Sequence, residues 1–334
     1  MIGALRITVC QRRLANGELE RPEVPAVLRA AGHHVRELDD GPLDWTGDDL
    51  LWMQGNANWY PLITARLAAA GRRRPRVVLW HTEPLPPPPT SGLPRPRLSL
   101  REIAKIALRD RRATDVYTNA ARLRRLARAG LPDVLVVSAR IRQDYLTGLG
   151  IASHFVPLGY DPGCHGRDLG LERDIDVLFL GTMQVPRRRR LVAGLRRAGV
   201  EVRTAGSWEG RDAWGDARTT LLNRTKILLN LPRHPGELAG LRMLLGMANG
   251  AMVVSEPIVD PEPYVPDRHY VEAPPALLPG VVRHYLAHPD QRGRVAGEAR
   301  CFVTTELTMR RSVGRILALV TGDAPVPAAA ERGG

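Results

Sequence analysis

The sequence has 334 residues, which suits two domains of about 150 residues each. Its 44% hydrophobic and 25% charged residues exclude a wholly disordered chain, and no long apolar run predicts a membrane-spanning helix. The formal net charge is +13, but only two of the 48 basic residues are lysines, which indicates codon bias more than nucleic-acid binding. Three scattered cysteines and no secretory signal predict a cytoplasmic protein without a disulfide framework.

Strand-length apolar runs alternate with helical patterns along the first half, residues 1–157, which predicts a Rossmann-like α/β domain with a parallel sheet. The proline run 86–89 follows a predicted strand and forms a stiff loop at the sheet edge where ligands bind in open α/β folds. We expect strands near 4–10, 33–38, 49–54, 76–81, 115–118, 134–138 and 154–158, and helices near 22–31, 59–70, 98–112, 120–129 and 140–148.

A joint rich in proline and glycine, PLGYDP at 157–162, introduces a second Rossmann-like domain over residues 158–304. A final helix at 305–321 is long enough to cross back to the first domain, and residues 322–334 are expected to be a disordered tail. Strands are expected near 175–181, 200–205, 226–231, 251–255 and 269–272, and helices near 187–198, 216–223, 239–249, 276–287 and 290–301.

Several well-known motifs are absent from the sequence. No GxGxxG follows the first strand, and neither lysine belongs to a GxxxxGK[ST] loop, so a classical dinucleotide site and a P-loop are excluded. The nine histidines are dispersed, and no HExxH is present, so we expect no metal site. Asp174 and Asp176 form a DxD pattern, but they begin a strand, away from the ligand edge, so we interpret them as structural.

An anion site is predicted where a buried strand ends at Gly181 and Thr182 and an arginine-rich helix begins at 187–190. A helix N-terminus offers free N–H groups, and Gly181 lets the backbone approach a ligand. Arg187 or Arg188 would then neutralise a diphosphate. The alternative is a solvated basic helix start, although cations are disfavoured at that end of a helix unless an anion is present.

Arg242 and Glu256 are the charged residues of the helix, turn and strand at 240–257. Because Glu256 follows the carboxyl end of the strand, both side chains are expected to face a ligand at the sheet edge. The alternative is a structural pair between Arg242 and Glu256, or plain surface charges.

Polar residues also follow two strands of the first domain. His81 and Glu83 alternate by two, so they share one face, which would open into the cleft; either could be a general base. Gln54, Asn56 and Asn58 end another strand and could bind an acceptor. The alternatives are capping of loop backbone by the first pair and bonding of loop carbonyls by the amides.

The second half resembles the CgeB-type (spore maturation protein B-like) group of glycosyltransferases, which have the GT-B architecture of two Rossmann-like domains facing across a cleft. The first half resembles this family only in its alternating rhythm. The matching stretches are PLGYDP (157–162), DVLFLGTMQVPRRRRLVAGL (176–195), LLNLPR (228–233), LRMLLGMANGAMVVSE (241–256) and HYLAHPDQRGRVAGEA (284–299).

The resemblance implies transfer of a sugar from a nucleotide-diphosphate donor to a hydroxyl acceptor, with neither metal nor cofactor. It places a catalytic glutamate at Glu237, whereas Leu245 occupies the position that looks like the ribose-binding glutamate of related enzymes. Glu256 or backbone groups would then hold the ribose. The alternative is a GT-B protein without catalytic activity.

The basic excess is concentrated between residues 95 and 128, which contain 11 basic and 3 acidic residues. The helix expected there is amphipathic, so contact with an anionic membrane is a further expectation. No nucleic-acid partner is expected. A protein that only docks on an anionic membrane or nucleic acid through this region is the remaining alternative.

Overall fold

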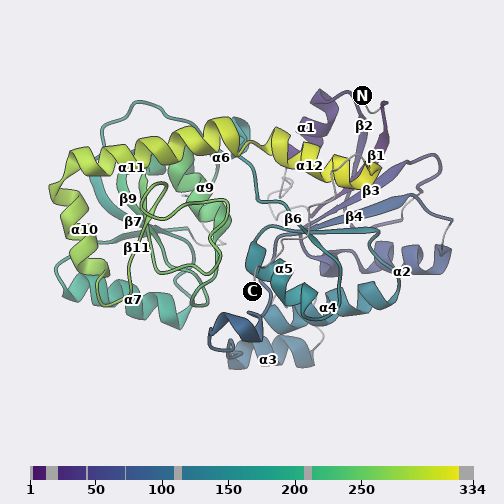
Figure 1. The fold of residues 1–334 in the computed structure, drawn as a ribbon, viewed down its shortest axis with the longest axis horizontal. Coiled ribbons are helices and arrows are strands. Elements are labelled where there is room, and N and C mark those ends of the chain that lie inside the picture. Colours follow the sequence, from purple (N-terminus) through teal and green to yellow (C-terminus); the bar gives the residue numbers. More distant parts are fainter. Residues whose placement is uncertain are drawn as a thin grey trace, which may run out of the picture.

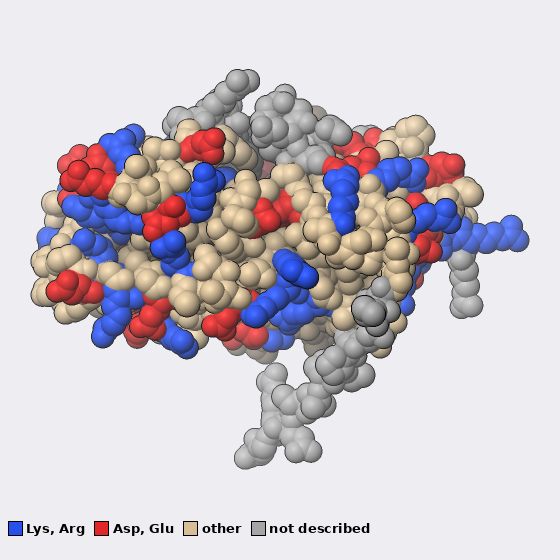
Figure 2. Space-filling model, turned by 90° about the horizontal axis from the view of Figure 1, so that it is seen from above, with Lys and Arg blue, Asp and Glu red and all other residues tan. Residues whose placement is uncertain are grey.

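The computed structural model describes residues 3–12, 22–42, 44–71, 73–108, 115–206 and 213–322, with the backbone alone at Arg101. The chain forms two α/β domains, each built on a parallel sheet (Figure 1). Among the described residues, no helix is both long and apolar enough to cross a lipid bilayer. Basic and acidic side chains are interspersed over the face shown in Figure 2.

The first domain is a six-stranded parallel sheet in the order β2-β1-β3-β4-β5-β6. β3 is buried along its whole length and β4 along all but its first residue, which explains their continuous apolar sequences. The strands are β1 (Arg6–Cys10), β2 (His34–Leu38), β3 (Leu50–Gln54), β4 (Arg76–His81), β5 (Val134–Val137) and β6 (His154–Phe155). The helices are α1 (Glu23–Ala30), η1 (Ala57–Trp59), α2 (Pro61–Ala70), η2 (Pro89–Ser91), α3 (Leu100–Ala107), α4 (Val116–Arg128) and α5 (Arg140–Thr147).

The strand expected at 115–118 is instead the start of α4. The Asp115 carboxylate accepts hydrogen bonds from the N–H groups of Tyr117 and Thr118, at 3.0 and 2.9 Å. This N-cap satisfies two of the donors that a helix start leaves free. The prediction was therefore wrong because the β-branched and aromatic residues after Asp115 resemble a strand, while the cap starts a helix.

The second domain is a five-stranded parallel sheet in the order β11-β10-β9-β7-β8. Helices cover this sheet on both faces, as Figure 1 shows. The strands are β7 (Ile175–Leu180), β8 (Arg203–Ala205), β9 (Thr225–Asn230), β10 (Met252–Ser255) and β11 (Val271–Glu272). The helices are α6 (Pro162–His165), α7 (Pro186–Arg197), α8 (Gly215–Asn223), α9 (Gly240–Ala248), α10 (Leu278–Ala287), α11 (Pro289–Cys301), a π-helical segment η3 (Phe302–Glu306) and α12 (Met309–Thr321).

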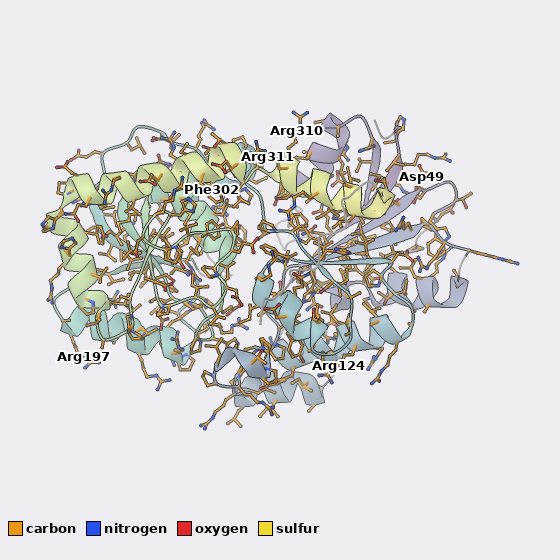
Figure 3. All side chains as sticks on the ribbon, viewed as in Figure 1. Asp49, Arg124, Arg197, Phe302, Arg310 and Arg311 are labelled. Carbon is orange, nitrogen blue, oxygen red and sulfur yellow. The ribbon has the colours of Figure 1, made fainter. Side chains whose placement is uncertain are left out.

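The chain crosses between the domains twice, at 157–161 and at 307–309. These segments pair, because Tyr160 N–H donates to the Leu307 carbonyl at 2.6 Å and Met309 N–H donates to the Tyr160 carbonyl at 2.7 Å. Before the second crossing, Phe302 of η3 stacks on His269 at 4.2 Å within the second domain (Figure 3). After it, α12 packs its apolar side chains into the core of the first domain. The tail expected at 322–334 lies outside the described residues, apart from Gly322.

Candidate active site between the two domains

A cluster of arginines lies at the carboxyl edge of the second sheet. α7 begins shortly after β7, and Arg188, in its first turn, is only 7% exposed. Its Nε donates to the Leu231 carbonyl at 2.9 Å, and its Nη1 donates to the Thr182 carbonyl at 3.4 Å. Arg188 is therefore held against the sheet edge and is not a solvated basic residue.

Arg242 reaches the same place from α9. Its Nε donates to the Leu180 carbonyl at 2.7 Å, and its Nη1 donates to the Asn230 side-chain oxygen at 3.0 Å. The guanidinium carbons of Arg242 and Arg188 lie 5.1 and 5.6 Å from the ring centre of Phe179. The aromatic ring thus supports two cations that come from different helices.

The cluster carries an excess of buried positive charge. Burial, with a contribution from Arg188, lowers the pKa of Arg242 to about 9. Burial and then Arg233 lower the pKa of Arg188 to about 10. Both side chains remain protonated at neutral pH, so an anion placed here would relieve their repulsion and replace part of their lost hydration.

Arg187 and Glu256 form an ion pair at the edge of this cluster. Both terminal nitrogens of Arg187 donate to the Glu256 carboxylate, one of them at 2.8 Å. Glu256 is 2% exposed and follows β10 directly. Glu256 therefore pairs with Arg187, not with Arg242 as the structural alternative had it.

Gly181 and Thr182 form the turn between β7 and α7. Gly181 has a φ of +147°, and a Cβ at this position would lie 3.0 Å from Nη2 of Arg242. Glycine is thus needed both for the backbone conformation and for the close approach of the guanidinium group. The Thr182 hydroxyl accepts from the Gln184 N–H at 3.2 Å, while the Thr182 carbonyl faces Arg188.

Glu237 is the acidic residue at the centre of the site. It is half-buried in the loop before α9. Its negative charge acts to raise the pKa of Arg188 and Arg242 in its own domain, and also that of Arg142 in the first domain. One carboxylate thus interacts with cations on both sides of the domain boundary.

A crevice between the domains opens beside Glu237. Its free space is about 30 Å³, and its walls are mostly proline and leucine. Gly236 of the second domain lies against Leu93 in the wall of this crevice, because a Cβ at Gly236 would lie 2.6 Å from the Leu93 side chain. The lining residues are Pro84, Leu85, Pro87, Leu93, Pro94, Pro96, Ile141, Arg142, His234, Pro235, Glu237 and Leu238.

The sequence did not indicate Arg142, which lies in the wall of this crevice. Its Nη1 donates to the Thr82 carbonyl at 2.6 Å and to the Ser138 hydroxyl at 2.8 Å. Glu237 and Glu83, from opposite domains, both act to raise its pKa, against the larger effect of burial. Arg142 therefore links the polar ends of β4 and β5 to the acidic loop of the second domain.

His81 and Glu83 lie at the carboxyl end of β4 but differ in burial. His81 is fully buried, and burial followed by the charge of Arg142 lowers its pKa to about 3. The backbone groups of Gly55 and Glu83 act in the opposite direction, toward a higher pKa, but do not outweigh burial. Glu83 is half-buried. The expected opening of both side chains into the cleft is therefore not seen for His81.

The three amides expected to bind an acceptor follow β3. Gln54 and Asn56 are buried, and Asn56 donates to the Asn119 side chain at 2.7 Å and accepts from the Asn58 N–H at 3.0 Å. The Gln54 oxygen accepts from the Trp52 ring N–H at 3.1 Å. Asn58 is half-buried. Gln54 and Asn56 thus bond within their own domain here.

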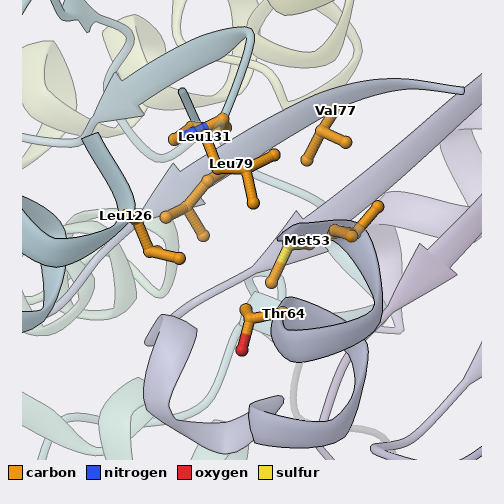
Figure 4. A pocket seen from close by; sticks show the side chains of 8 residues that line it. Met53, Thr64, Val77, Leu79, Leu126 and Leu131 are labelled. Carbon is orange, nitrogen blue, oxygen red and sulfur yellow. The ribbon is translucent and has the colours of Figure 1, made fainter. Parts of the chain in front are cut away.

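Other expectations fall outside the site. Leu245 is 4% exposed and packs with Leu180 and Leu228 in the core. Asp174 and Asp176 pair with Arg224 and Lys226 on the surface. Figure 4 shows a second cavity, in the core of the first domain, whose roughly 10 Å³ suits no substrate. No group of three or more metal-ligating side chains occurs in the described part of the chain.

Comparison with known proteins agrees with the two-domain α/β fold described above. Residues 187–318, from α7 into α12, match the model of a glycosyl transferase-like family. No curated protein matches the chain in sequence.

Solved structures resemble the whole fold. Sucrose-phosphate synthase from Thermosynechococcus elongatus is 12% identical, with a TM-score of 0.62 over 96% of this chain and 100% of that chain. Anabaena Alr3699/HepE in complex with UDP and glucose is 11% identical, with a TM-score of 0.58 over 95% and 100%. TarM is 10% identical, with a TM-score of 0.57 over 81% of this chain and 54% of that chain, so this chain spans about half of TarM.

The fold is therefore the GT-B architecture, two Rossmann-like domains on parallel sheets, as predicted. Residues 187–318 are thus similar in sequence to glycosyl transferase-like proteins, and the whole chain is similar in fold to glycosyltransferases.

Proposed function

We propose that the protein moves a sugar from a nucleotide-diphosphate donor to the hydroxyl group of an acceptor in the cytoplasm, with arginines in place of a metal ion. The observation that carries the proposal is the buried cluster of Arg188 and Arg242, in which burial lowers the pKa of both and the neighbouring arginines lower it further, Arg233 for Arg188 and Arg188 for Arg242. A diphosphate would supply the missing negative charge.

The donor is proposed to be a nucleoside diphosphate sugar, and UDP-glucose is the first one to test. HepE, whose fold is similar, is known in complex with UDP and glucose. We also propose that the chain belongs to the CgeB-type branch. Arg242, in the stretch that resembles this branch, lies directly beside Gly181.

The proposed reaction breaks the bond between the anomeric carbon and the diphosphate while the acceptor oxygen bonds to that carbon. Arg188 and Arg242 would stabilise the charge that develops on the leaving diphosphate. Glu83 is the better candidate to take the acceptor proton, because His81 is fully buried. Glu237, next to the arginines, would stabilise positive charge on the sugar or bind its hydroxyl groups.

The hydroxyl-bearing end of the acceptor is proposed to enter the crevice between the domains, whose free space of about 30 Å³ is too small for a whole acceptor unless the domains move. Proline, leucine and isoleucine walls offer few hydrogen-bond donors, while Arg142, His234 and Glu237 supply a polar end. The acceptor class that fits is a hydroxyl compound with an apolar body. Movement of the domains toward each other would exclude water from the reacting centre.

A nucleotide-binding experiment tests the proposal. UDP, GDP and dTDP and their glucose derivatives are added to wild type and to Arg188→Met, and the melting temperature is recorded. Loss of a buried charge-assisted contact should weaken nucleotide binding by roughly tenfold to a hundredfold. Arg189→Met is the matched control, because Arg189 is the next residue of the same helix but is exposed.

We expect wild type and Arg189→Met to be stabilised by the same nucleotide, and the stabilisation of Arg188→Met to be much smaller. Circular dichroism checks that each variant folds. Equal stabilisation of a folded Arg188→Met would refute the diphosphate site. Nucleotide binding by wild type without hydrolysis or transfer, over a range of acceptors, would instead support the non-catalytic alternative.

A further inference from the structure

α3 presents an apolar stripe to solvent. Leu100 is 86% exposed, Ile103 48%, Ile106 38% and Leu108, at the helix C-cap, 81%. Three-residue steps place Leu100, Ile103 and Ile106 along one side of this short helix, and Leu108 follows at its end. Four large apolar side chains exposed within nine residues are costly in water unless another surface covers them.

The conformation of α3 is stabilised locally. The Ser99 N–H donates to the Glu102 carboxylate at 2.7 Å, and the Glu102 N–H donates to the Ser99 hydroxyl at 3.2 Å, which forms a complete capping box. The segment before the helix is tied down as well, because the Tyr117 hydroxyl donates to the Pro96 carbonyl at 2.8 Å. The stripe is thus presented on a formed helix.

Basic residues flank these apolar side chains in the sequence. Arg95 and Arg97 are exposed just before α3, and Lys105 lies on the helix. Arg124, Arg125 and Arg128 of α4 are also exposed. Figure 3 shows Arg124 on the same lower side of the molecule where Figure 1 places α3.

Few acidic groups oppose this basic charge. Residues 95–128 contain 3 acidic residues against 11 basic ones. Two of the three acidic side chains, Glu102 and Asp115, are engaged as caps of α3 and α4. Among the described side chains of residues 95–128, seven are basic and two are acidic, so the described part of this segment is positive as well as apolar.

We propose that α3 and its flanking basic residues form a docking surface for an anionic lipid bilayer. Leucine and isoleucine side chains would enter the boundary between headgroups and acyl chains, and the arginines would contact lipid phosphates. A nucleic acid would use the arginines but would leave four aliphatic side chains uncovered. An anionic bilayer would contact both the aliphatic side chains and the arginines.

The proposed docking surface on α3 follows closely in the chain after two residues that line the crevice between the domains. Pro94 and Pro96 line the crevice and immediately precede α3. Docking through α3 would therefore bring the crevice close to the bilayer surface. The docking surface itself does not depend on the proposed sugar transfer, and vesicle binding tests it without any measurement of activity.

Co-sedimentation with vesicles is the experiment. The probes are vesicles of phosphatidylcholine alone and vesicles in which about a third of the lipid is phosphatidylglycerol. The test variant is Leu100→Asp/Leu108→Ser, and the matched control is Leu277→Asp/Leu171→Ser. The control removes two leucines of the second domain, 60% and 41% exposed, and changes the net charge equally. An aspartate at Leu100 is compatible with the first turn of α3.

We expect wild type and the control to bind anionic vesicles, to bind neutral vesicles more weakly, and to be released by salt. Binding by Leu100→Asp/Leu108→Ser should be weaker by roughly tenfold or more, with an unchanged melting temperature. Arg95→Gln/Arg97→Gln should also weaken binding to anionic vesicles.

Three results would overturn the proposal. The first is wild type that stays in the supernatant with anionic vesicles. The second is equal binding by wild type and Leu100→Asp/Leu108→Ser, which would mean that net charge alone attracts the protein. The third is a wild-type dimer that this variant converts to a monomer without any change in vesicle binding, because α3 would then be covered by a second copy of the chain.

Discussion

Arg187 and Arg188 are neighbours in the sequence but have different surroundings in the fold. Arg188 points under α7 onto the sheet edge, where it is buried, while Arg187 is bound by Glu256. A strand, a glycine turn and a basic helix start could be predicted from the sequence. Which arginine would be buried could not, because that depends on the angle at which the helix packs on the sheet.

The place of Arg142 in the crevice wall could not be predicted from the sequence for a similar reason. It is one of several arginines in a charged segment, and only the packing of α5 directs it toward Thr82 and Ser138. The burial of Gln54 and Asn56 was equally unpredictable. Their amide groups find partners in Trp52 and Asn119, and Asn119 is distant in the sequence.

Burial of His81 predicts a stability that depends on pH. Its pKa is lowered from 6.5 to about 3, so across this interval the unfolded chain binds a proton that the folded chain does not. Stability should therefore fall as the pH is lowered from about 6.5, and His81 should contribute a loss of about 2 kcal/mol between pH 7 and pH 5. Urea unfolding of wild type and His81→Gln at several pH values measures this term.

The quantity compared is the slope of the free energy of unfolding against pH. An overall change in stability caused by the substitution does not affect this slope. The free energy of unfolding of His81→Gln should decline less steeply on acidification than that of wild type. His34→Gln is the control, because His34 lies on the surface of β2. Parallel curves of unfolding free energy against pH for wild type and His81→Gln would show that His81 is not a buried neutral imidazole in the folded protein.

At the level of elements, the strands that are buried on both faces were the easiest to predict. β4 matches its expected range of 76–81 because an uninterrupted apolar run of that length fits a central parallel strand. The ends of helices depend on capping residues, and the sequence predicts the positions of these ends less accurately. α4, capped by Asp115, begins at Val116, four residues before the helix expected at 120–129.

The paired crossings depend on Gly159. A Cβ at this position would lie 2.5 Å from backbone atoms of Thr308 and Met309, and backbone cannot move aside as a flexible side chain can. Gly159→Ala should therefore push the two crossing segments apart and lower the stability by about 1–3 kcal/mol. Chemical unfolding measures the loss, and hydrogen exchange at the amide of Met309, which donates to Tyr160, should become faster.

Gly280→Ala is the control for this substitution. Gly280 lies in α10, and a Cβ there meets nothing within 4 Å. Alanine in an exposed helix should be neutral or stabilise by up to about 1 kcal/mol. If Gly159→Ala behaved like Gly280→Ala, the close approach of the two crossings would not constrain the fold.

At the scale of the whole molecule, two Rossmann-like halves could be predicted from the repeated alternation of strands and helices. The crevice between them could not, because its walls come from distant segments. Leu93 and Gly236 touch across the boundary, although more than a hundred residues separate them. Such a contact depends on how the domains are placed, which local sequence patterns do not encode.

The last helix makes the first domain dependent on the end of the chain. Met309, Val313, Ile316, Leu317 and Val320 of α12 are buried against β-strands and α1 of the first domain. Burial of each such side chain contributes about 1.5–3 kcal/mol, so a chain that ends at residue 304 should lose stability comparable to the whole stability of a usual domain.

A chain that ends at Gly322 keeps α12 and is the matched control. We expect this control to unfold like wild type, and the chain ending at 304 to lose the near-ultraviolet circular dichroism of the packed Trp52 and Trp80 rings and to bind a hydrophobic dye. The second domain should be affected less, because its sheet and α7 to α11 lie before the truncation. A cooperatively folded first domain in the chain ending at 304 would show that α12 only rests on a core that is complete without it.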